Sequence, residues 1–132
     1  MIKKLRENIY IGDKDAYTSL DELKALSITS VVVVADEMEI KDNLPNQEPR
    51  VFKMGLRGDR INPPHIKDLV CHTAKYMAQN GEIVLIQSTT GWQRAAFVAC
   101  RVICELETRT IYEIMQEVKQ EIPEFDIGKS YF

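Results

Sequence analysis

The stretch Val84–Phe97, "VLIQSTTGWQRAAF", joins an apolar, strand-like run to a helix-like run and decides the fold. The apolar run at 82–86 predicts a buried strand, and residues 94–106 are apolar nearly all round. A helix that is apolar on every side belongs at the centre of a molecule. The sequence therefore predicts a central strand, a short polar connection and a central helix.

Apolar and β-branched runs recur upstream of this unit. "SVVVVA" at 30–35 is continuous, as expected for a strand covered on both faces, and "RVFKMG" at 50–55 alternates. The segment 36–49 between these two runs is polar and holds two prolines, which predicts a surface loop. The predicted strands are 8–12, 30–35, 50–55 and 82–86.

Helical spacing of apolar residues fills the intervals between the predicted strands, and capping residues mark where each helix begins. Ser19-x-x-Glu22 and Thr110-x-x-Glu113 each form a capping box. The remaining signals are Asn62 as a cap with Pro63 at the first helical position, and stops at Asn80-Gly81 and Pro123.

Alternating strands and helices predict an α/β fold, with a central, mostly parallel sheet flanked by helices on both faces. At 132 residues the chain is long enough for one domain, so residues 1–132 are taken as a single domain. Ligands of such sheets bind beyond the carboxyl ends of the strands. Residues 87–94 lie at that position.

The composition restricts the classes of partner. A net charge of -3 argues against general nucleic-acid binding, and neither a signal peptide nor an apolar run of about 20 residues occurs. We therefore expect a cytoplasmic protein with no membrane or nucleic-acid partner. Cys100 and Cys104 share a helical face, and with His65 or His72 they suggest a metal site, but we expect packed thiols and no metal or cofactor.

The connection at 87–94 has the chemistry of an anion cradle. Backbone N–H groups ahead of a helix converge on one point, and the helix dipole adds partial positive charge. Gly91 permits a close approach of the backbone, and Arg94 in the first helical turn can hold two oxygens. The alternative is an ordinary strand-to-helix connection whose arginine extends into solvent.

"IQSTTGWQRA" resembles the phosphate-binding loop of the cysteine-dependent dual-specificity protein phosphatases, His-Cys-x-x-Gly-x-x-Arg-Ser/Thr. The segments "NIYIGDKDAYTSLDELKALSITSVVVVADE", "MGLRGDRINPPHI" and "IYEIMQEVKQEIPEF" extend the resemblance over nearly the whole chain. It implies that Ser88 stands at the nucleophile position, that Arg94 holds phosphate and that Asp59 is the general acid. The implied phosphate-binding residues are Ser88, Thr89, Thr90, Gly91, Trp92, Gln93 and Arg94.

Two of these positions have plainer interpretations. Asp59 follows a glycine and is also typical of a solvated turn, and Trp92 is expected to pack rather than to face a ligand. Arg57 and Arg60, on either side of Asp59, would extend a positive rim unless they are simply solvated.

The departures from the family pattern concern catalysis. A serine nucleophile needs an adjacent general base, and Gln87, which replaces the family histidine, is no base. Ala95 replaces the hydroxyl that assists breakdown of the phospho-enzyme. The sequence therefore favours a catalytically impaired domain that binds a phosphoprotein, a phosphorylated small ligand, or phosphate- and sulfate-type anions. The alternatives are an active phosphatase whose cysteine was replaced by Ser88, and a scaffold that no longer binds anions.

Overall fold

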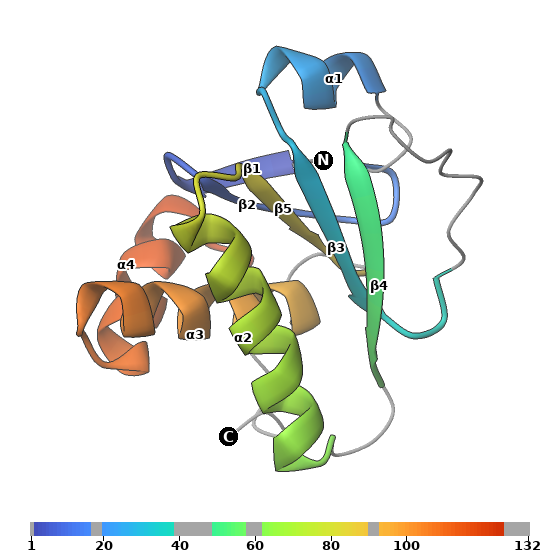
Figure 1. Cartoon of the computed structure of the whole chain (residues 1–132). Helices are drawn as coiled ribbons and strands as arrows, with labels where there is room; N and C mark the ends of the chain where they lie inside the picture. The colour runs from blue at the N-terminus through green and yellow to red at the C-terminus, as the bar shows by residue number, and fades with distance from the viewer. Residues whose placement is uncertain (1, 17–19, 39–48, 58–61, 90–92, 126–132) are drawn as a thin grey trace.

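The structure is a computed structural model that describes residues 2–16, 20–38, 49–57, 62–89 and 93–125 (Figure 1). Five strands form one sheet in the order β1-β2-β5-β3-β4. β2, β5, β3 and β4 run parallel, and only β1 is antiparallel to its neighbour. The strands are β1 (Ile2–Arg6), β2 (Ile9–Gly12), β3 (Ser30–Ala35), β4 (Arg50–Leu56) and β5 (Val84–Gln87).

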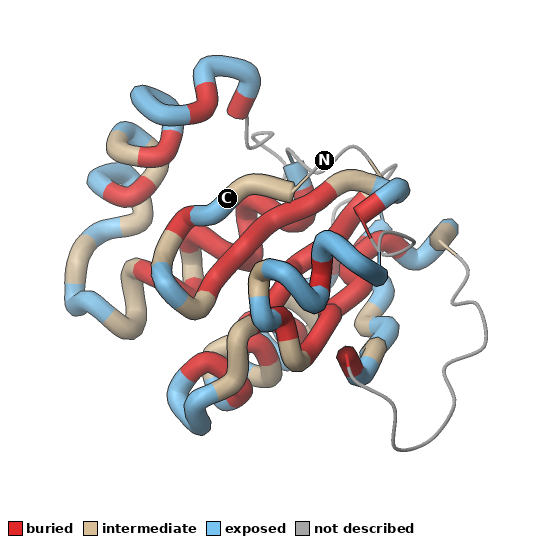
Figure 2. The backbone as a smooth tube through the Cα atoms, turned by 90° about the horizontal axis from the view of Figure 1, so that it is seen from above, coloured by how far each residue is buried: buried red, intermediate tan, exposed pale blue. Residues whose placement is uncertain are grey.

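Helices cover both faces of this sheet, which confirms the predicted α/β class. On one face β3 buries Val32 and Val34 against the three long helices, and on the other Val31 and Val33 pack with Leu23 of α1. Figure 2 shows the buried backbone running through the centre of the molecule. The helices are α1 (Leu20–Ala25), α2 (Pro64–Gln79), α3 (Arg94–Glu107) and α4 (Ile111–Glu121).

The central helix α3 has the position that its composition predicts. Its first seven residues, 94–100, are all buried, and α2 and α4 pack beside it. Thr110 caps α4 as expected, because its hydroxyl accepts a hydrogen bond from the N–H of Glu113. Asn80 and Gly81 end α2, and Gly81 has φ +81°, a conformation that glycine adopts without strain.

The predicted start of α2 is wrong by one residue. Pro63 is the N-cap and Pro64 the first helical residue, so Asn62 does not cap the helix. The buried side chain of Asn62 instead accepts a hydrogen bond from the N–H of Arg57 at 2.8 Å and donates one to the Arg57 carbonyl at 2.9 Å. The amide therefore holds both ends of the segment between β4 and α2. The Ser19 cap of α1 lies outside the described residues.

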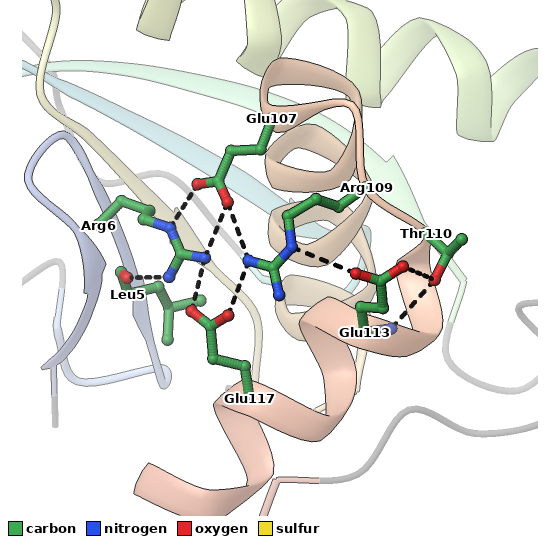
Figure 3. A network of polar contacts seen from close by, with 7 residues as sticks. All are labelled: Leu5, Arg6, Glu107, Arg109, Thr110, Glu113 and Glu117. Atoms are coloured by element: carbon green, nitrogen blue, oxygen red, sulfur yellow. Dashed lines mark hydrogen bonds and ion pairs between the residues drawn. The ribbon is translucent and has the colours of Figure 1, made fainter.

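The sequence analysis missed β1, the edge strand. "IKKLR" buries only Leu5 and has no clear apolar alternation, so its sequence does not predict a strand. The strand is recognised in the structure by its antiparallel pairing with β2. A charged network also holds this strand to the last two helices (Figure 3). Arg6 contacts Glu107 at 2.6 Å and Glu117 at 2.7 Å, and Arg109 contacts Glu117 at 2.8 Å.

Cys71 and Cys100 are fully buried, as expected of thiols packed in a core, and burial raises the pKa of each to about 12. Their thiols therefore stay protonated at neutral pH. Among the described residues there is no group of three or more histidine, cysteine and acidic side chains placed to hold a metal ion. Within the same residues, every helix is too short or too polar to cross a bilayer.

Ile103, on α3, is fully buried at the centre of the core. We expect Ile103→Ala to lower the free energy of unfolding by about 2–5 kcal/mol, because it removes buried methylene groups and leaves a cavity. Leu69→Ala on α2 is the control, because Leu69 is 56% exposed, and it should change the free energy of unfolding by less than about 0.5 kcal/mol. Urea denaturation measures both, and equal effects would contradict the packing described for α3.

Candidate functional site

The segment that follows β5, of which Ser88, Thr89 and Gln93 are described, is called the β5 loop. It begins at the carboxyl end of β5, the central strand of the sheet, between the loops that follow β2 and β3. The Ser88 N–H donates to the Gly12 carbonyl at 3.2 Å, and the Lys14 N–H donates to the Thr89 carbonyl at 3.1 Å. The loop after β2 is therefore hydrogen-bonded along the first two residues of the β5 loop. This attachment fixes the point at which the chain turns toward α3.

Gln87, the last residue of β5, is fully buried. Its Nε2 donates to the Asp13 carbonyl at 2.6 Å, while its Oε1 is buried without a hydrogen-bond partner among the described residues. The uncharged amide of Gln87 therefore holds the loop after β2 through its hydrogen bond to Asp13. It supplies neither a positive charge nor a base beside Ser88.

Ser88 is buried, with 1% of its surface exposed. Its Oγ accepts a hydrogen bond from the N–H of Ala95 at 3.3 Å, which satisfies one of the free N–H groups in the first turn of α3. Within the described part of the chain, no hydrogen bond joins Ser88 to a histidine or a carboxylate. The hydroxyl therefore stabilises the start of the helix and has no general base there to activate it.

Arg94, the first residue of α3, is buried and held from two sides. Its Nη1 and Nη2 donate to the two carboxylate oxygens of Glu37, each at 2.5 Å, and Nη1 also donates to the Leu56 carbonyl at 3.0 Å. Arg94 does not extend into solvent, so the alternative interpretation is wrong about the position of this side chain. The guanidinium is fixed at the carboxyl ends of β3, β4 and β5.

Glu37 is the site residue that the sequence analysis did not identify. It follows β3 and accepts hydrogen bonds from Arg94 and from the Thr89 hydroxyl. The Arg94 guanidinium lowers the pKa of the Glu37 carboxyl far below its usual value, so the carboxylate stays charged. Its side chain is 47% exposed while that of Arg94 is 10% exposed, so solvent reaches the pair from the Glu37 side.

The structure brings Ser88, Thr89 and Arg94 together, as the resemblance implies for these three residues. Gln93 is exposed and precedes α3, and its side chain makes no capping hydrogen bond. Arg57 lies 3.6 Å from Asp36, so a carboxylate partly balances the positive rim expected of it. Asp59, Arg60, Thr90, Gly91 and Trp92 lie outside the described residues.

Comparisons with solved structures identify the fold. A point variant of human DUSP28 aligns with a TM-score of 0.83 over 98% of this chain and 88% of its own, at 15% sequence identity. The human tyrosine phosphatase-like serine/threonine/tyrosine-interacting protein aligns with a TM-score of 0.78 over 98% and 89%, also at 15% identity. A mouse protein titled a dual specificity phosphatase, complexed with zinc tungstate, gives 0.75 over 98% and 80% at 17%.

These similarities show that the chain has the α/β fold of the dual-specificity phosphatases. No protein-family model matches the sequence. No curated protein matches it either. The fold agrees with the one that the loop resemblance implied, and the chain is phosphatase-like in architecture.

The Glu37–Arg94 pair predicts how stability depends on pH. Because the pKa of Glu37 is lower in the folded chain than in the unfolded chain, the pair stabilises the fold above the unfolded value and loses this effect as the pH falls. We expect the wild type to lose more stability than Glu37→Gln between about pH 5 and about pH 3. Chemical denaturation across this range tests it, and parallel pH profiles for the two proteins would refute it.

Proposed function

We propose that this protein binds phosphorylated ligands through the loop at 88–94 and does not hydrolyse them efficiently. The observation that carries the proposal is the buried, fixed guanidinium of Arg94 beside a Ser88 hydroxyl that has no base among its described partners. The first feature serves anion binding, and the second argues against a nucleophile.

Arg94 supports the binding part of the proposal. A guanidinium has five N–H donors in a planar fork that matches the oxygens of a phosphate. The Leu56 carbonyl and the Glu37 carboxylate order this side chain, and an anion that binds shares the guanidinium with Glu37 or replaces its carboxylate. The amino end of α3 lies at the same place and adds partial positive charge.

Ser88 and its neighbours support the catalytic part. An alcohol is a much weaker acid than a thiol, so it needs a base to become a nucleophile. The Ala95 N–H donates to the Ser88 Oγ, and Gln87 is neutral and occupied with the Asp13 carbonyl. These contacts hold Ser88 in place without activating it. The domain is therefore proposed to bind phosphate groups without hydrolysing them efficiently, on a fold shared with phosphatases.

Removal of Arg94 tests binding directly. We expect Arg94→Ala to weaken the binding of inorganic phosphate or tungstate roughly 10- to 100-fold, because charge-assisted hydrogen bonds to the anion are lost. Isothermal titration calorimetry measures the affinity. Arg101→Ala is a matched control, since Arg101 lies on the same helix and pairs with Asp68. Equal affinity of wild type and Arg94→Ala would refute the proposed site.

Replacement of the serine tests whether only the nucleophile is missing. We expect Ser88→Cys to stay at background in hydrolysis of an aryl phosphate, because Gln87 supplies no positive charge beside the thiol and Ala95 no hydroxyl. Phosphate binding by the same variant shows that its loop is formed. Turnover that appears in Ser88→Cys and falls when Asp59→Asn is added would identify an active phosphatase and overturn this proposal.

A further inference from the structure

Two loops flank the β5 loop, and both are acidic. The described residues after β2 include Asp13, Lys14 and Asp15, and those after β3 include Asp36 and Glu37. These segments carry four carboxylates and one ammonium group, and of the carboxylates Asp36 lies 3.6 Å from Arg57. Since β2 and β3 are the immediate neighbours of β5 and run parallel to it, their loops emerge on either side of Ser88.

Hydrogen bonds attach both acidic loops to the β5 loop. On the β2 side the Asp13 carbonyl accepts from Gln87 and the Lys14 N–H donates to the Thr89 carbonyl. On the β3 side Glu37 accepts from Thr89 and Arg94. The Glu37 carboxylate therefore contacts the guanidinium directly, and the loop at 13–15 is held by its backbone to Gln87 and Thr89.

This arrangement selects against ligands that carry only negative charge. A phosphate that approaches Arg94 must share the guanidinium with Glu37 or displace its carboxylate, and either event places two anions near each other. The flanking carboxylates add further repulsion for a ligand with several phosphates or acidic neighbours. A positive group beside the phosphate removes this difficulty, because it can pair with Glu37 and with the acidic loop after β2.

We infer that the ligand is a phosphorylated peptide with arginine or lysine residues next to the phosphorylated residue. The inference rests on the proposed function and specifies its ligand. The phosphate contacts Arg94, and the basic side chains of the peptide contact the loops at 13–15 and 36–37. Such a ligand satisfies both charges of the Glu37–Arg94 pair at once, whereas free phosphate satisfies only one of them.

A matched set of phosphotyrosine peptides tests the inference, with arginine, alanine or glutamate on both sides of the phosphotyrosine. We expect the arginine peptide to bind roughly tenfold more tightly than the glutamate peptide, with alanine between them, as several exposed charge pairs would give. The difference should shrink in about 0.5 M salt because exposed charges are screened. Fluorescence anisotropy with labelled peptides measures all three affinities.

Charge-removing variants locate the effect. Asp13→Asn with Asp15→Asn should reduce the preference for the arginine peptide at least threefold while phosphate binding persists. Glu37→Gln also changes the support of Arg94, so only the ratio of its affinities for the arginine and glutamate peptides is compared, and this ratio should fall at least threefold. Asp21→Asn with Glu22→Gln is the matched control for the double variant, since it changes the net charge equally on α1, which Figure 1 shows at the other end of β3. The control should keep the wild-type preference.

The outcomes separate this inference from the proposed function. Binding that requires Arg94 but is equal for the three peptides, or strongest for the glutamate peptide, overturns the ligand class and leaves phosphate binding intact. Absence of phosphopeptide binding, or binding that survives Arg94→Ala, overturns the proposed function itself. A preference for arginine that persists in both sets of charge-removing variants refutes the role of these loops.

Discussion

The burial of β5 on both faces and along both edges is the constraint on which the rest of the structure depends. Its backbone groups are paired with β2 on one side and β3 on the other, and its side chains are enclosed by helices of both layers. Residues that follow β5 can therefore reach a ligand only beyond the end of the strand, after Gln87. The buried helix α3 must start a few residues later, and its first turn brings Arg94 back against the same strand ends.

A guanidinium in this position needs a counter-charge, because an unpaired buried charge is strongly destabilising. Glu37 supplies it from the loop after β3, and the Leu56 carbonyl, which also accepts the Asp36 N–H at 3.1 Å, completes the shell. One carboxylate thus neutralises Arg94 in the fold, and in the proposed function the same carboxylate faces the ligand.

The strands and helices with strong periodicity were predictable, and "SVVVVA" matches β3 residue for residue. Arg94 was singled out by its spacing from Gly91 and Ser88 by the family resemblance, and the roles of both stay predictions. Glu37 did not, because an acidic residue in a polar loop carries no signal until the strand order places that loop beside Arg94. Asn62 misled for a related reason, since its amide suits a helix cap equally well and its actual partner, Arg57, lies upstream. The proposed cytoplasmic location stays a prediction.

The network around Arg6 has a consequence for the order in which the chain assembles. Arg6 and Glu107 are 101 positions apart, and Glu117 lies further still, so the partners of β1 are synthesised long after β1 itself. β1 can pair with its neighbour early, since that hairpin is local. The full network of Arg6, Glu107, Arg109 and Glu117 can form only when α4 has been synthesised and has packed against α3. The network therefore forms late in the folding of these residues, and a nascent chain that lacks α4 has the Glu107 contact of Arg6 but not the Glu117 contact.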